Sequence, residues 1–155
     1  MFFASIDQTT PQQTIQGFQQ AIIAGNYKRA FAYMTHEAQT AMIAGWYFSA
    51  AYLAQDDPVA GQVLAKLIDR YGISDKTKNK SRNSRELVKM FRALLRWSRT
   101  HHSAEDAIDP GAAMAQTAYS DFRIKADKAY VLCTDGKDRK SESRLVCVDG
   151  RWYLC

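Results

Sequence analysis

The sequence is poor in cysteine, and its three cysteines fit neither the spacing of a metal site nor a disulfide framework. Cys133 and Cys147 fall on neighbouring predicted strands, where a disulfide is conceivable, but buried free thiols are the favoured interpretation. Long apolar runs are also missing. The longest, from Ala41 to Ala54, is shorter than the roughly 20 residues of a membrane-spanning helix.

The N-terminus lacks the basic stretch and the apolar run of a secretory signal peptide, so a cytoplasmic protein is expected. Nucleophile elbows, phosphate-binding loops and zinc spacings are absent, and we predict no cofactor, no bound metal and no catalytic residue. His101-His102 with Glu105 and Asp106 comes nearest to a metal set, but adjacent histidines in a polar segment are usually only solvated. At 155 residues we expect one domain, spanning residues 1–155.

The clearest positive signal is a set of strands at the end of the chain. Asp149-Gly150 lies between two β-prone runs, which predicts a two-residue type I′ hairpin that pairs Cys147 with Trp152. Upstream, Asp127-Lys128 separates two further strands in the same way. Alternation along the strands then places eight residues on the face that helices must cover. They are Phe122, Ile124, Val131, Cys133, Leu145, Cys147, Trp152 and Leu154.

The opposite face of this predicted sheet could serve as a homodimer interface, because apolar residues recur on it. They are Tyr130, Leu132, Val146, Val148 and Tyr153.

Helix start and stop signals recur in the first half of the chain. Thr10-Pro11 with Gln13 forms a capping box, and Gly25 ends the first helix. Asn26 caps a short second helix. A third helix, from Glu37 to Ala54, is apolar nearly all round, which indicates a centrally buried helix or one that lines an interface.

Two further helices are separated by a polar segment. Asp57-Pro58 starts a fourth helix that ends at Gly72. Its inward residues are Val63, Leu64, Leu67, Ile68 and Tyr71. Residues 74–83 are polar and basic, which predicts a mobile loop. Asn83 then opens a helix that runs to about Thr100.

The first helix running into Gly25-Asn26-Tyr27, together with the last hairpin at residues 148–153, resembles the nuclear-transport-factor-2-like superfamily and its small bacterial domains of unknown function. The resemblance covers residues 10–34 and 119–155. It implies an α+β fold with N-terminal helices packed on one face of a C-terminal curved antiparallel β-meander of about four strands, forming a cone with a pocket. The family usually places strands between its second and third helices, whereas residues 35–75 have a helical pattern.

A pocket of this kind would bind a small, flat apolar ligand between helices and sheet. Its expected lining is aromatic, although core packing explains the same residues equally well. The residues are Trp46, Tyr52, Phe91 and Trp152. Enzymes among the similar proteins place an Asp–His or Asp–Tyr pair inside the cone. The nearest candidates, Tyr119 and Asp121, are expected to point outward because Phe122 and Ile124 occupy the inner side. A small isomerase or cyclase therefore remains the alternative function.

Acidic residues are almost missing from residues 76–102, which hold nine of the 21 Lys and Arg but one of the 16 Asp and Glu. Five of these cations recur at the spacing of one helical stripe, opposite a row of apolar residues. The stripe consists of Arg85, Lys89, Arg92, Arg96 and Arg99, and the preceding loop adds Lys76, Lys78, Lys80 and Arg82. Either the stripe is a solvated surface, or it binds an anionic macromolecule. The leading hypothesis is a non-enzymatic binding module that uses this helix or the pocket.

Overall fold

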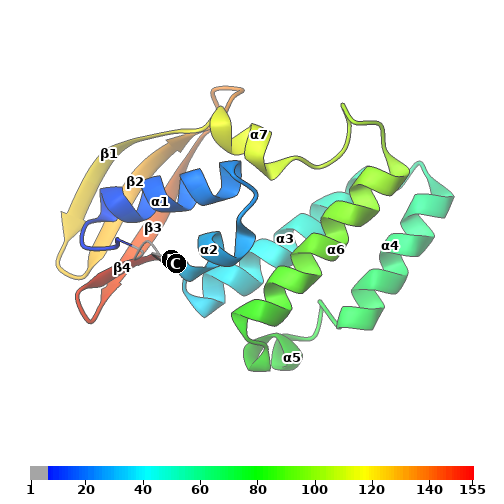
Figure 1. Cartoon of the computed structure of the whole chain (residues 1–155), viewed down its shortest axis with the longest axis horizontal. Helices are drawn as coiled ribbons and strands as arrows, with labels where there is room; N and C mark the ends of the chain where they lie inside the picture. The colour runs from blue at the N-terminus through cyan, green and yellow to red at the C-terminus, as the bar shows by residue number, and fades with distance from the viewer. Residues whose placement is uncertain (1–6) are drawn as a thin grey trace, which may run out of the picture. The chain divides into compact units, whose positions relative to one another are not determined.

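The predicted fold class is confirmed by a computed structural model, which describes residues 7–155 except for the side chain of Lys76 (Figure 1). Helices precede a four-stranded antiparallel sheet whose strands follow the order β1-β2-β3-β4. The helices are α1 (Pro11–Ile23), α2 (Tyr27–Ala32), α3 (His36–Leu53), α4 (Pro58–Tyr71), α5 (Lys76–Ser81), α6 (Ser84–His101) and α7 (Pro110–Ala115). The strands are β1 (Ala118–Lys125), β2 (Lys128–Thr134), β3 (Lys140–Val148) and β4 (Arg151–Leu154).

The chain forms two compact units. The sheet unit consists of residues 7–35 and 110–155, with α1, α2, α7 and all four strands. The helical unit consists of residues 36–109, with α3, α4, α5 and α6. The prediction of one domain stays a prediction. The helical pattern of residues 35–75 is confirmed by α3 and α4.

The β3–β4 hairpin has the predicted register. Cys147 pairs with Trp152, and Leu145 pairs with Leu154. Both turn residues have positive φ, 52° at Asp149 and 77° at Gly150, as a type I′ turn requires. The local signal in the sequence was therefore sufficient to define this hairpin.

The β1–β2 pair differs from the prediction in two places. Its turn residues are Ala126 and Asp127, one position earlier than expected, and Lys125 pairs with Lys128. A β-bulge follows between Ser120 and Arg123, where two residues of β1 oppose one residue of β2 and Asp121 adopts a φ of 53°. The extra residue reverses the alternation of side chains upstream of the bulge.

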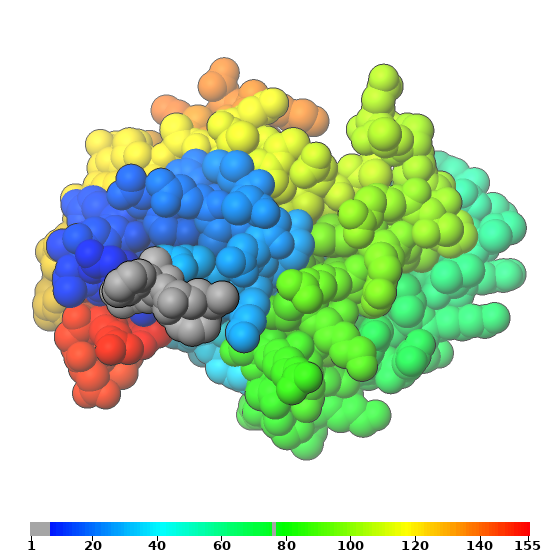
Figure 2. All heavy atoms as spheres, viewed as in Figure 1, coloured from blue at the N-terminus to red at the C-terminus, as the bar shows by residue number. Residues whose placement is uncertain are grey.

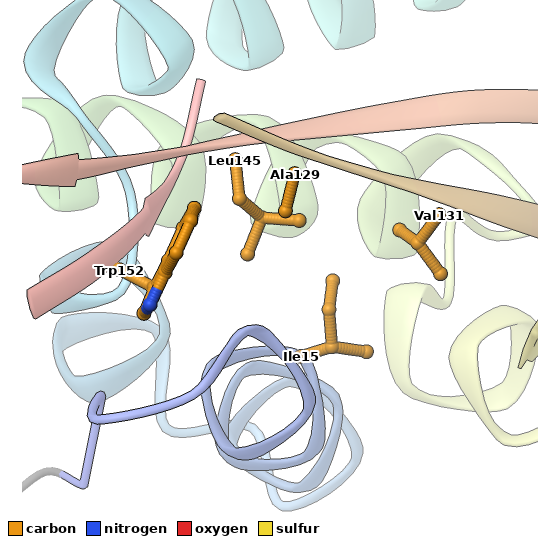
Figure 3. Close-up of a cluster of buried hydrophobic side chains, with 5 residues drawn as sticks. All are labelled: Ile15, Ala129, Val131, Leu145 and Trp152. Atoms are coloured by element: carbon orange, nitrogen blue, oxygen red, sulfur yellow. The ribbon is translucent and has the colours of Figure 1, made fainter. Parts of the chain in front are cut away.

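The core of the sheet unit lies between α1 and one face of the sheet. Figure 3 shows Ile15 of α1 pointing towards a buried cluster on three strands. The strand members are Ala129, Val131, Leu145 and Trp152. The Trp152 main chain is fastened to the N-terminal segment, because its carbonyl accepts hydrogen bonds from Gln8 Nε2 at 2.7 Å and Thr14 Oγ1 at 3.0 Å.

The predicted inner face is largely confirmed, with two corrections. Phe122, Cys147 and Leu154 are partly buried against the cluster, as expected. Tyr119 packs there too, so the expectation that it points outward was wrong; the bulge returns it to the inner side. Ile124 shares the face of its partner Ala129 but is 58% exposed, so it is not part of the core.

Helix caps follow the sequence closely. The Thr10 hydroxyl accepts from Gln13 N, and the Gln13 side chain accepts from Thr10 N, which completes the predicted capping box. Gly72 has the left-handed conformation of a helix C-terminus, with a φ of 59°. Residues 76–81, within the segment predicted as a loop, form the short helix α5, because Asp75 accepts from Thr77 N and caps it.

The helical unit is built around α6. Its buried residues occupy the side predicted as apolar, and α6 packs against both α3 and α4. In contrast, α3 buries only Gln39, Ile43, Tyr47 and Ala50. Val63 of α4, predicted to face inward, is 38% exposed. Of the two interpretations of α3, central burial is therefore wrong, and a helix that lines an interface stays a prediction.

Candidate functional site

The basic stripe of α6 is fully displayed at the surface. All five of its residues, Arg85, Lys89, Arg92, Arg96 and Arg99, are exposed. They follow one another at intervals of three and four residues, so each lies roughly 5–6 Å from the next. Figure 2 shows atoms of α6, in green to yellow-green, at the surface of the molecule.

None of the five stripe residues forms an ion pair with the acids that the structure describes. Ion pairs in the described part of the chain join Arg123 and Arg144 to Glu142, and Arg139 to Asp135. Glu86, the single acid of α6, lies in its first turn, where the positive end of the helix dipole stabilises its negative charge. The positive charge of the stripe is consequently not neutralised by neighbouring carboxylates.

Two buried hydrogen bonds hold α6 in place within the helical unit. Tyr47 Oη of α3 donates to the Met90 carbonyl at 2.7 Å. Trp97 Nε1 of α6 donates to the Ala60 carbonyl of α4 at 3.0 Å. Because both bonds connect α6 to neighbouring helices, the exposed stripe is carried on an anchored element.

The four aromatic residues predicted to line a pocket are distributed over both units. Trp46 and Phe91 are in contact, with ring centroids 6.3 Å apart. Tyr52 is 72% exposed, and Trp152 belongs to the core of the sheet unit. Trp46 also borders an open depression on α3 with Met42, Gly45 and Ser49. Among the features of the helical unit, this depression corresponds best to the predicted ligand pocket, because it includes Trp46.

Large apolar side chains of α3 and α4 reach solvent. Phe48 is 59% exposed, Leu53 is 66% exposed, and Val59 is 67% exposed. Residues 38–55 contain no charged side chain at all. Exposed apolar surface without charge is typical of interaction sites, but nothing in this surface selects a partner.

Two buried tyrosines and one exposed aspartate have shifted pKa values. Burial raises the pKa of Tyr47, the nearby Tyr71 raises it further, and Arg96 lowers it. Burial likewise raises the pKa of Tyr119, whose hydroxyl lies 3.6 Å from Met114 Sδ. In exposed Asp135, hydrogen bonds from the backbone of Arg139 and Lys137 lower the carboxyl pKa.

The histidines considered as metal ligands pack on an aromatic ring. The rings of His101 and His102 lie 6.0 Å and 5.2 Å from that of Trp97, measured between centroids. Throughout residues 7–155, no group of three or more His, Cys, Asp or Glu side chains is arranged to hold a metal ion. Cys133 and Cys147 are free thiols.

The outer face of the sheet, opposite the core cluster, is more basic than the sequence suggested. Its apolar residues form two groups, Tyr130 with Leu132 on β2, and Val146 with Val148 and Tyr153 on β3 and β4, and cations lie beside both groups. Tyr130, for example, pairs with Arg123 on one side and Arg144 on the other. The net charge of residues 118–155 does not reveal the basic face, because acids in the turns offset cations in the strands.

The comparisons with known proteins add no relative. Searches with protein-family models, with curated proteins and with solved structures each gave no significant match. Within the described residues, no helix combines the length and the hydropathy needed to cross a bilayer. The resemblance to the nuclear-transport-factor-2-like superfamily stays a prediction.

Proposed function

We propose that this protein is a non-enzymatic binding module that holds an anionic macromolecule on the basic stripe of α6. The observation that carries the proposal is the set of five exposed cations without a paired carboxylate among the described residues. We further propose that the sheet unit is a nuclear-transport-factor-2-like scaffold, which is supported by α1 packed across an antiparallel meander.

The charge pattern favours binding over mere solvation. Like charges three or four residues apart on a helix repel by about 0.2–0.5 kcal/mol per pair, and the stripe contains four consecutive pairs of this kind. A solvated helix face normally mixes both signs, which removes this repulsion. A polyanion would relieve it and would release counterions on binding, so its affinity should fall steeply with salt.

The other roles considered rest on weaker features. A small apolar ligand would occupy the depression beside Trp46, and a homodimer would use the outer face of the sheet. An isomerase or cyclase would need polar groups directed into a cavity of the sheet unit. Gln8 and Thr14, which are buried there, instead bond the Trp152 carbonyl. These contacts favour a structural use of the interior.

The proposal is tested by charge reversal and chromatography on heparin. The double variant Arg92→Glu and Arg96→Glu should elute at clearly lower salt than the parent, because it replaces two cations of the stripe. The matched control is Lys66→Glu with Arg70→Glu on α4. It changes the net charge equally, at the same spacing, on exposed residues of the same unit.

Retention of the control close to that of the parent would assign binding to α6. If both double variants lost retention on heparin equally, net charge alone would explain the effect, and the proposal would be overturned. Retention of the α6 variant like that of the parent would also overturn it. Circular dichroism of each variant shows whether the fold is kept.

A further inference from the structure

The outer face of the sheet gathers cations from all four strands. Alternation and register place two rows of side chains there, Lys125–Lys128–Val146–Tyr153 and Arg123–Tyr130–Arg144. Lys140 on β3 and Arg151 on β4 extend the same face at its two ends. The cations are exposed, with the side chains of Arg123 and Arg144 71% and 70% accessible.

Acids are scarce on this face. Of the six Asp and Glu in residues 118–155, four lie in the turns between strands, and Asp121 lies in the bulge of β1. Glu142 is the one acid at a regular strand position, in a sheet whose strands are all described. It pairs with Arg123 at 3.0 Å and lies 3.8 Å from Arg144. Six cations therefore face one acid.

Two of the lysines are placed directly against each other. Lys125 and Lys128 form a cross-strand pair, and both are exposed. Like charges opposite one another destabilise a sheet, so a solvated surface gains nothing from this arrangement. An anion bound across the pair would remove the repulsion.

Aromatic rings lie among these cations. Tyr130 on β2 and Tyr153 on β4 are half-buried, so their side chains lie close to the sheet and keep part of their surface in solvent. They are two strands apart, about 10 Å across the sheet, and belong to the two adjacent rows. Two rings held apart in this way can each stack with a different base of one extended strand, because base faces stack on aromatic side chains.

We propose that the outer face of the sheet binds single-stranded nucleic acid. The exposed lysines and arginines contact the phosphates, and Tyr130 and Tyr153 stack with bases. Stacking requires bases that are not already paired, so a duplex loses this part of the binding energy. The inference rests on residues of the sheet unit alone, and it is independent of the stripe on α6, which contains no aromatic residue on its exposed side.

The experiment measures binding of a fluorescein-labelled oligothymidylate to the full chain by fluorescence anisotropy. Tyr130→Ala should weaken binding about 5- to 140-fold, the usual effect of removing one stacking ring. Tyr130→Phe retains the ring and should bind like the parent. Lys125→Glu with Lys128→Glu, both exposed, should also weaken binding and flatten its dependence on salt.

Controls separate this surface from α6 and from other occupants. When Tyr130→Ala is added to the Arg92→Glu and Arg96→Glu variant, oligonucleotide binding should weaken as much as it does in the parent. A duplex of equal length should bind more weakly than the single strand. Equal affinity for both forms with no effect of Tyr130→Ala would overturn the proposal. It would also be overturned if polyglutamate bound as tightly as the oligonucleotide, or if the face proved to be covered by a second copy of the chain that the oligonucleotide does not displace.

Discussion

Replacement of Trp152 by alanine should strongly destabilise the sheet unit. Trp152 is 8% exposed and packs in the cluster with Ile15 and Leu145. An aromatic side chain buries about 150–250 Å², which corresponds to about 4–6 kcal/mol at 25 cal/mol per Å². Large-to-small core substitutions of this type cost about 3–5 kcal/mol, and we expect the same loss here.

The loss should come from packing alone. The hydrogen bonds from Gln8 and Thr14 reach the Trp152 carbonyl, and Trp152 N donates to the Gln8 carbonyl at 2.9 Å. All three use the main chain of Trp152, so alanine can still form them. A measured cost well above about 5 kcal/mol would indicate that these bonds also fail.

The assay is urea unfolding followed by far-ultraviolet circular dichroism, with the free energy extrapolated to water. Because whole domains are stable by only about 5–15 kcal/mol, the variant should unfold at a much lower urea concentration. The matched control is Trp46→Ala. That ring is half-buried beside Phe91, and its loss should cost less than about 2 kcal/mol. A cost below about 1 kcal/mol for Trp152→Ala would refute the assignment of the core.

Two further predictions concern the backbone and pH. Gly150→Ala should lower the free energy of unfolding by about 1–2 kcal/mol, because φ is 77° at this position and a Cβ disfavours the left-handed region; an unchanged urea midpoint would contradict the type I′ turn. Burial raises the pKa of Tyr47 and Tyr119 in the folded chain above the value of about 10 in the unfolded chain. The contribution of these two tyrosines to the free energy of unfolding should be complete below about pH 10 and decline as the pH rises further. Phenolate absorbance should show both side chains ionising only when the protein unfolds. Titration of all tyrosines at about pH 10 in the folded protein would disprove this.

The features that could be predicted from sequence are those decided within a few residues. The Thr10–Gln13 capping box and the Asp149-Gly150 hairpin depend on side-chain chemistry and φ preferences at adjacent positions. The apolar side of α6 was also evident, because an amphipathic helix repeats its pattern over several turns.

What could not be predicted depends on contacts between distant residues or on one inserted position. The bulge at Asp121 leaves no local signature that simple alternation can detect, and it changed the orientation expected for Tyr119. The cationic outer face was also missed. A net charge summed over a segment counts Glu142 and Asp127 equally. Only Glu142, which is in a strand, lies on the outer face, because Asp127 is in a turn.

The sheet unit is discontinuous in the chain, and this determines when it can form during synthesis on the ribosome. Ile15 of its core emerges more than a hundred residues before Trp152 and Leu154. The main chain of Leu154 then forms hydrogen bonds with Tyr33 and Thr35. The helical unit is contiguous and is complete once residue 109 has emerged. During translation, the apolar face of α1 therefore stays uncovered until the strands have been synthesised. Exposed apolar surface of this kind makes a nascent chain prone to aggregation and a substrate for chaperones.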